Sequence, residues 1–437
     1  MNTLVFDTNK RLGKFKLLNA TNGGPWHKRH TTEQPRSNFE DYKAARIPYS
    51  RNHDSGVVGA YGGPYSHDVT RIFPNFDADV NDPASYDFAC TDESILVTLD
   101  AGTETYFRLG ETIEHQVKKH ATLPPKDFHK WAEICEHIIR HYNEGWADGF
   151  ELGIKYWEIW NEADLDDDDS TNKKNWGGTK AQFFDLYEIA AKHLKAKFPH
   201  LKIGGPSLAG KVAWAKDFLS EMRRRDVPID FFSWHKYAAN PEQILEKGED
   251  LYKLLIEYGY GDVESHLTEY NYMRSWVDSY KYSICAIQRL KNASFILSCM
   301  AVGQRAPFID MMMYYDTRPS IWCGPFDFYT CDKRKPYYPL AWYGSFYDLE
   351  AEVRSKNTVD DIYSLCGVDK DGKVRCMLTY FTESDDSENK EITLDFGKDA
   401  KYEVYILDNE RDGELLCVTD KPVLDLPVHA CVLIKEI

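Results

Sequence analysis

Eight short apolar runs typical of β-strands alternate along most of the chain with longer amphipathic segments typical of α-helices. The runs begin at Phe15, Ala45, Thr105, Lys155, Lys202, Asp230, Ser265 and Ile309. The helical segments cover residues 125–145, 180–198, 212–225, 241–259 and 281–303. The third segment repeats apolar residues three and four positions apart, as a helix with one buried face does. Eight strands that alternate with helices predict an α/β fold, a (β/α)8 TIM barrel over residues 15–349.

After about residue 350 the pattern changes to short β-branched runs separated by turn residues such as those of DKDG. Six runs begin at Asp361, Lys373, Lys390, Lys401, Glu414 and Ala430. Runs of this length and spacing predict a small antiparallel β-sandwich over residues 350–437. We expect residues 335–349 to form the last barrel helix and residues 1–14 to add a strand to the sandwich.

The composition is that of an ordinary globular protein, with 43% hydrophobic and 28% charged residues among 437. The formal net charge of −17 repels phosphate backbones and anionic membranes, so we expect neither nucleic acid nor membrane as a partner. The N-terminal segment lacks the apolar stretch of a secretory signal, and the ten cysteines show no C-x-x-C spacing. We therefore expect a cytoplasmic protein with reduced thiols.

Two glutamates follow strand runs of the predicted barrel, at the end where such barrels carry their active sites. Glu162 closes the segment YWEIWNE, and Glu269 lies in SHLTEY. Cleavage of a glycosidic bond needs two facing carboxyl groups: one protonates the leaving oxygen, and the other attacks the sugar or activates water. Either glutamate alone would be an ordinary loop carboxylate as often as not. The pair on these two strands predicts a glycosidase.

These motifs resemble those of glycoside hydrolase clan A, and within it family 39, the family of β-xylosidases and α-L-iduronidases. The likeness covers nearly the whole chain, through WNE at 160–162, TEY at 268–270, RNHD at 51–54, GGPS at 204–207 and FSWHKY at 232–237. The resemblance implies a retaining mechanism without cofactor or metal. One position departs from the clan pattern, because Ala163 stands where proline usually follows N-E.

The resemblance also implies roles for individual residues. Glu162 would be the general acid/base and Glu269 the nucleophile. Asn161 would donate a hydrogen bond to the substrate 2-hydroxyl, and Arg51 would keep Glu269 ionised. The remaining pocket residues by this resemblance are His53 at the floor, His235 beside the acid/base and Tyr237 bonded to the nucleophile.

Other candidate site residues are inferred from their place in the sequence, without the family resemblance. Trp322, after the last strand run, is expected to form a wall on which a sugar ring stacks, with core packing as the alternative. Glu111 could bond a sugar hydroxyl or be a surface charge, and Trp176 could close over the substrate. The acidic run 164–169 directly follows Glu162, but its spacing matches no EF-hand loop. We expect a solvated, flexible lid there rather than a calcium site.

The sequence thus predicts a retaining exo-glycoside hydrolase that acts on short oligosaccharides or glycosides, with β-D-xylosidase activity as the first expectation. An α-L-arabinofuranosidase, a β-galactosidase, a β-glucosidase and an inactive carbohydrate-binding barrel stay open as alternatives, as does a homo-oligomeric state. An α-L-iduronidase is disfavoured because a uronate needs a basic pocket and the net charge is strongly negative. A metal-dependent hydrolase is disfavoured because His27 and His30 lack His-x-His spacing.

Overall fold

Eight parallel strands close a barrel in chain order, β2-β3-β4-β5-β6-β7-β8-β9. The computed structural model describes residues 2–26, 37–55, 65–319, 322, 324–357 and 359–437, so His27 and His30 lie outside the described residues. The strands are β2 (Leu17–Asn22), β3 (Tyr49–Arg51), β4 (Glu104–Leu109), β5 (Tyr156–Ile159), β6 (Lys202–Leu208), β7 (Phe231–Ala238), β8 (Glu264–Tyr272) and β9 (Met311–Tyr314). Each predicted strand run overlaps one of them, which confirms the (β/α)8 barrel.

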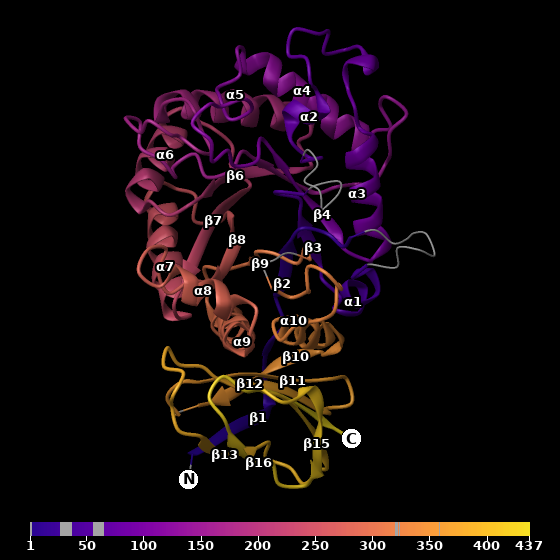
Figure 1. Cartoon of the computed structure of the whole chain (residues 1–437), viewed down its shortest axis with the longest axis vertical. Helices are drawn as coiled ribbons and strands as arrows, with labels where there is room; N and C mark the ends of the chain where they lie inside the picture. Colours follow the sequence, from indigo (N-terminus) through magenta and orange to yellow (C-terminus); the bar gives the residue numbers. More distant parts are fainter. Residues whose placement is uncertain (1, 27–36, 56–64, 320–321, 323, 358) are drawn as a thin grey trace.

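Helices surround the barrel on its outside (Figure 1). Those that follow β4 to β7 are α4 (Phe128–Asn143), α5 (Lys180–Lys197), α6 (Val212–Arg224) and α7 (Glu242–Glu257), all within the predicted segments. Local sequence fixes where they begin: the Asp127 carboxylate accepts the N–H groups of His129 and Lys130 at the start of α4. At α5, Thr179 and Gln182 form a reciprocal capping box. Further helices not predicted from the sequence are α1 (Phe39–Ala44), α2 (Val69–Ile72) and α3 (Ala89–Asp100).

The predicted helix over residues 281–303 is instead two helices, α8 (Tyr280–Ile287) and α9 (Leu290–Arg305). The backbone at Arg289 is extended, with φ −122° and ψ −179°. Asn292 stabilises the break, because its side-chain amide donates to the Ile287 carbonyl and to the Tyr314 hydroxyl, each at 2.8 Å. Helix α9 is buried on nearly all sides because it packs between the barrel and the C-terminal sheet (Figure 1).

The C-terminal sheet has nine strands in the order β15-β14-β17-β12-β11-β10-β1-β13-β16. They are β1 (Asn2–Gly13), β10 (Ala351–Lys356), β11 (Ile362–Val368), β12 (Val374–Tyr380), β13 (Lys390–Asp395), β14 (Tyr402–Leu407), β15 (Asp412–Thr419), β16 (Val423–Leu426) and β17 (Cys431–Glu436). Strand β1 pairs antiparallel with β10 and parallel with β13, so the sheet is mixed rather than purely antiparallel. The chain leaves the barrel through α10 (Tyr337–Gly344), which lies at the junction of the two parts.

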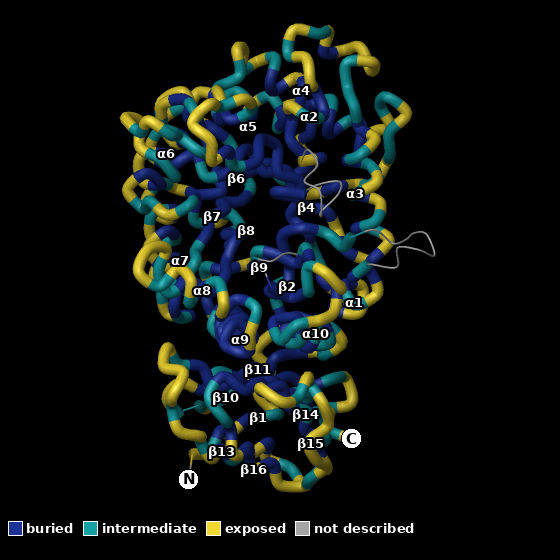
Figure 2. Tube along the Cα trace, viewed as in Figure 1, coloured by how far each residue is buried: buried dark blue, intermediate teal, exposed yellow. Residues whose placement is uncertain are grey.

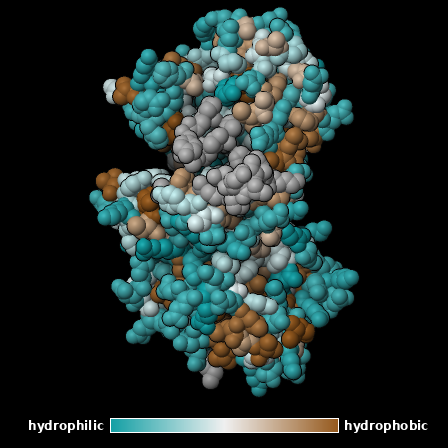
Figure 3. All heavy atoms as spheres, turned by 45° about the vertical axis from the view of Figure 1, so that its right-hand side comes forward, coloured by the Kyte–Doolittle hydropathy of each residue, from teal (hydrophilic) through white to brown (hydrophobic). Residues whose placement is uncertain are grey.

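Buried residues fill the barrel and the interior of the sheet domain (Figure 2). Inside the barrel, large side chains from the first residues of the strands pack together and close the amino end: Tyr106, Tyr156, Phe231, Met311 and Met313. Most of the face seen in Figure 3 is hydrophilic, with several hydrophobic patches, the largest of them at the sheet end. In the sheet, β15 exposes Leu415 and Val418. Within the described part of the chain, no helix is both long enough and apolar enough to span a membrane.

Candidate active site

A cavity of about 980 Å³ opens at the carboxyl ends of the barrel strands. Six of the residues predicted for the site line it: His53, Asn161, Glu162, Tyr237, Glu269 and Trp322. Arg51 and His235 are fully buried directly behind these side chains. Because the amino end of the barrel is filled by aromatic and methionine side chains, the polar residues collect at the opposite end.

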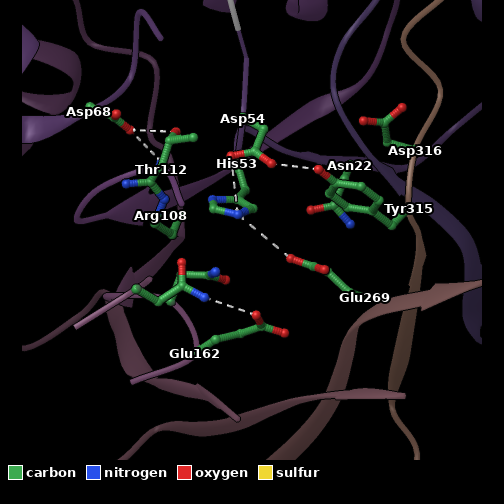
Figure 4. A network of polar contacts seen from close by, with 12 residues as sticks. Asn22, His53, Asp54, Asp68, Arg108, Thr112, Glu162, Glu269, Tyr315 and Asp316 are labelled. Carbon is green, nitrogen blue, oxygen red and sulfur yellow. Dashed lines mark hydrogen bonds and ion pairs between the residues drawn. The ribbon is translucent and has the colours of Figure 1, made fainter. Parts of the chain in front are cut away.

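Glu162 and Glu269 approach the same space from β5 and β8 (Figure 4). One oxygen of each carboxyl group and one ring nitrogen of His235 all lie within 4.8 Å of one another. The chain after β5 turns sharply, with positive φ angles at Trp160 (70°) and Glu162 (47°) that non-glycine residues rarely adopt. The Glu162 N–H donates to the Ser207 carbonyl at 2.9 Å, which holds this turn against β6.

Arg51 connects the polar residues beneath the cavity. Its Nη1 donates to the Glu269 carboxylate at 2.9 Å, as expected, but its Nε donates to the Glu158 carboxylate at the shorter distance of 2.6 Å. The other bonds of the guanidinium reach Asn22 (3.0 Å), Asn161 (2.7 Å) and Ser207 (2.8 Å). Although burial opposes its charge, the two carboxylates raise the pKa of Arg51. The guanidinium therefore stays charged and fixes the positions of its partners.

Burial determines the protonation of the two glutamates. It raises the pKa of Glu162 to about 8, with a further increase from the nearby Asp164 carboxylate. Burial also raises the pKa of Glu269, although His235 and Arg51 oppose the increase. Glu269 accepts hydrogen bonds from Arg51 and from the Tyr237 hydroxyl, the latter at 2.8 Å, so its ionised form is the better stabilised of the two. At neutral pH the carboxyl proton of the pair therefore resides mainly on Glu162.

The hydrogen bonds around His235 assign its tautomer. Asn161 Oδ1 can only accept, so the Ser207 hydroxyl must donate to it over 3.1 Å. Ser207 Oγ, which has one hydrogen, is then the acceptor for His235 Nε2 at 2.8 Å. The imidazole is neutral because burial lowers its pKa to about 4. His235 Nδ1 is therefore an acceptor, and the protonated Glu162 donates to it over 2.8 Å.

Several contacts at the site were not predicted from the sequence. The Asn175 side-chain amide donates to the second oxygen of Glu162 at 3.0 Å, from a loop that carries no local signal for this role. Ser207 lies in the GGPS motif, but the motif alone assigned it no function. The Tyr315 hydroxyl donates to Asp54, which lies 3.3 Å from His53 (Figure 4). His53 in turn lies 3.9 Å from Glu269.

The remaining candidates fall into two groups. Trp322 lines the cavity and stacks on Trp276, with ring centroids 6.3 Å apart and an angle of 17° between the planes. Glu111 and Trp176 are not among the lining residues. Glu111 is buried and accepts the N–H and hydroxyl of Thr70 at 3.0 and 2.6 Å. Trp176 is also buried, with its ring edge-on to Trp160.

The acidic run 164–169 is held by specific bonds rather than being a uniformly solvated lid. Asp164 is buried and accepts the backbone N–H groups of residues 209–211, which joins the loop after β5 to the loop after β6. Asp166 pairs with Lys174 at 2.7 Å, and Asp167 pairs with Lys211 at 2.8 Å.

Both cationic and anionic side chains line the cavity. Four of its lining residues are Lys174, Lys236, Lys247 and Arg318, and the acidic lining residues are Asp54, Glu162 and Glu269. Two of the cations are paired with carboxylates that do not line the cavity, Lys174 with Asp166 and Arg318 with Asp316.

Comparison with known proteins agrees with the geometry. Residues 66–259 match the family model of Glycosyl hydrolases family 39. A β-xylosidase of Geobacillus stearothermophilus is 28% identical over 219 residues, which is 45% of this chain and 40% of that protein. A β-xylosidase of Caldicellulosiruptor saccharolyticus is 27% identical over 243 residues, 50% of this chain and 47% of that protein. The chain thus matches less than half the length of either relative.

The whole fold has a counterpart among solved structures. A glucosidase from Croceicoccus marinus superposes with a TM-score of 0.80 at 21% identity, covering 100% of this chain and 99% of that one. At this identity the likeness establishes the shared fold alone. Together, the family model and the curated relatives confirm the resemblance to family 39 that the sequence motifs indicated.

Proposed function

We propose that the protein is a retaining exo-glycoside hydrolase that releases a terminal sugar, a β-D-xylosyl unit in the first instance, from short oligosaccharides or glycosides. The observation that carries this proposal is the spacing of Glu162 and Glu269, whose nearest oxygens lie within 4.8 Å. Retaining enzymes place their carboxyl groups about 5–5.5 Å apart, whereas inverting enzymes need about 6.5–9.5 Å to admit a water molecule. The names of the two curated relatives support the choice of sugar.

In the first step Glu269 attacks the anomeric carbon, and the bond from that carbon to the leaving oxygen breaks. Glu162 transfers its proton to the leaving oxygen at the same time. Arg51 and Tyr237 orient the attacking carboxylate. Asn161 Oδ1 is occupied by Arg51 and Ser207, so its amide Nδ2 is the group left to donate to the sugar 2-hydroxyl. The products of this step are a glycosyl ester on Glu269 and the free alcohol.

In the second step Glu162, now ionised, takes a proton from a water molecule that attacks the glycosyl ester. The sugar departs with its original configuration, and both carboxyl groups return to their starting states. The Asn175 amide donates to one Glu162 oxygen whether the carboxyl group is protonated or ionised, so this oxygen stays anchored through both proton transfers.

The test of substrate class is hydrolysis of 4-nitrophenyl glycosides of β-D-xylose, α-L-arabinofuranose, β-D-galactose and β-D-glucose by the purified protein. Proton NMR of the first-formed sugar should show the anomer of the substrate. Activity on none of these glycosides, or release of the opposite anomer, contradicts the proposal. If the protein hydrolysed only one of the last three glycosides, the proposed mechanism would stand and the sugar of that glycoside would replace xylose as the unit released.

Azide distinguishes the roles of the two glutamates. Glu162→Ala should still form the glycosyl ester from a 2,4-dinitrophenyl glycoside, because this leaving group needs little protonation. Azide needs no general base, so it should restore turnover and give a glycosyl azide of retained configuration. Glu269→Ala should give the inverted azide instead. On unactivated substrates each variant should lose several powers of ten in rate, about 4–7 kcal/mol in activation free energy. If Glu162→Ala gave the inverted azide and Glu269→Ala the retained azide, the roles of the two glutamates would be exchanged.

A further inference from the structure

Three lysines line the cavity on the side of Glu162 rather than Glu269. Burial and the charge of the nearby Lys236 lower the pKa of Lys247, which places Lys236 close to Lys247. Lys247, on α7, donates from its Nζ to the His235 carbonyl at 2.7 Å and to the Ala209 carbonyl at 3.2 Å. Lys174 directly precedes Asn175, the other hydrogen-bond partner of Glu162. The acid/base of a glycosidase faces the leaving group, so these lysines surround the region that the leaving group would occupy.

The three ammonium groups differ in how far the protein itself neutralises them. Lys174 is paired with Asp166 at 2.7 Å. Lys247 is buried, its Nζ donates to two backbone carbonyls, and the nearby Asp164 and Glu162 carboxyl groups oppose the lowering of its pKa by burial. Lys236 is half-buried and makes no ion pair or side-chain hydrogen bond with any residue that the structure describes. Burial lowers the pKa of Lys236, and Glu246 is the carboxylate that opposes this shift.

A half-buried ammonium group loses part of its hydration, and it interacts more strongly with an anion there than at an open surface. Two acidic residues of the cavity lining do not neutralise these lysines. Asp54 is bonded to Tyr315 beside Glu269, and Glu162 is protonated in the resting state. Lys247 lies close to Lys236, and the Asp164 carboxylate offsets part of its charge. Lys236 is therefore the least neutralised of the three ammonium groups on the Glu162 side of the cavity.

We infer that the leaving-group side of this cavity accepts an anionic group, a carboxylate or a phosphate carried by the leaving alcohol, with Lys236 as its ion-pair partner and Lys247 as a supporting charge. This inference rests on the proposed function, and it adds a substrate class to it: glycosides whose leaving group, not whose terminal sugar, is charged. Lys174 is neutralised in the free protein and contributes less.

The test compares aryl glycosides that share the sugar identified by the nitrophenyl panel and differ only in one ring substituent. The leaving groups are hydroxybenzamide, hydroxybenzoate and hydroxyphenylphosphonate, each as its meta and para isomers. The neutral amide is the best electron-withdrawing substituent of the three, so electronic effects oppose the expected preference. We expect kcat/KM for an anionic substrate to exceed that of its amide partner on the order of tenfold, the effect of one hydrogen bond to a charged group. A preference for benzoate, phosphonate or both identifies which anion the site takes.

Lys236→Met should remove most of this preference, and Lys236→Arg should retain much of it because the charge persists. Lys216→Met is the matched control, since Lys216 is exposed on α6 outside the cavity, and it should keep the wild-type ratio. The ratio should also fall as salt is raised. Equal kcat/KM values for anionic and neutral partners, or a preference unchanged in Lys236→Met, overturn the inference while the proposed function stands. Absence of hydrolysis of the amide glycosides together with inactivity on the nitrophenyl panel would overturn the proposed function itself.

Discussion

Replacing Glu162 by glutamine should stabilise the protein at alkaline pH while it abolishes efficient catalysis. Glutamine has the shape of a protonated glutamic acid. Its amide N–H can donate to His235 Nδ1 as the acid does, and its carbonyl can accept from the Asn175 amide. The variant therefore keeps both hydrogen bonds and loses only the ability to ionise. It directly probes how much the buried charge of ionised Glu162 lowers the free energy of unfolding.

The magnitude follows from the pKa of Glu162, which burial raises from 4.5 to about 8. One pKa unit corresponds to about 1.4 kcal/mol, so the shift corresponds to at most about 5 kcal/mol. The folded protein holds this proton more tightly than the unfolded chain, so wild-type stability falls as pH rises from about 4.5 to about 8. The glutamine variant has no such dependence. Its stability relative to wild type should therefore increase by about 2–5 kcal/mol over this interval, with the lower values allowing for relaxation of the site.

Denaturant unfolding followed by tryptophan fluorescence measures this difference, because all eleven tryptophans lie between residues 26 and 342 and report on the barrel. Curves at pH 4.5, 6 and 8 for wild type and Glu162→Gln give the change with pH. Glu257→Gln, at an exposed position at the end of α7, is the matched control and should show no trend. A difference between wild type and Glu162→Gln that is the same at all three pH values would refute the assignment of the raised pKa to Glu162.

Three further predictions concern the same network. The kcat/KM of the wild-type protein should decline above about pH 8, as Glu162 loses its proton in the free enzyme, and a plateau to pH 10 in the rate profile would contradict this. Ser207→Ala should move that decline to lower pH, because His235 can then place its proton on Nδ1 and stabilise ionised Glu162; an unchanged profile would reject the tautomer assignment. Arg51→Met should cost about 3–5 kcal/mol in unfolding free energy by leaving Glu158 and Glu269 without their cation, which calorimetry would detect.

The barrel could be predicted from the sequence because its signals are local. Each strand is a short apolar run, and each of the helices α4 to α7 carries its own periodic apolar face and, at α4 and α5, its own cap. The break between α8 and α9 could not be predicted in this way. It is stabilised by Asn292, whose amide reaches Tyr314 on β9, and a contact across 22 positions leaves no trace in helical periodicity. The parallel pairing of β1 with β13 has the same non-local origin.

The residues of the site also fall into those that the sequence could identify and those that depend on non-local contacts. Glu162 and Glu269 could be found because strand ends in a barrel meet at one face, so two carboxylates far apart in sequence were expected to converge. Asn175 donates to Glu162 from a loop thirteen positions further along the chain. The Ser207 hydroxyl donates to the side-chain oxygen of Asn161, 46 positions before it. Such partners depend on how loops fold over the barrel, which no spacing rule describes.

The expectation for Arg51 shows why proximity alone does not fix a protonation state. The sequence placed a cation beside Glu269, and the structure has it there at 2.9 Å. The same guanidinium also binds Glu158 at 2.6 Å, so a single positive charge is shared between two buried carboxylates. Burial then outweighs the attraction, and the pKa of Glu269 rises rather than falls. What separates the two catalytic candidates is the set of donors: Arg51 and Tyr237 favour the anion at Glu269, whereas the acceptor nitrogen of His235 favours the proton at Glu162.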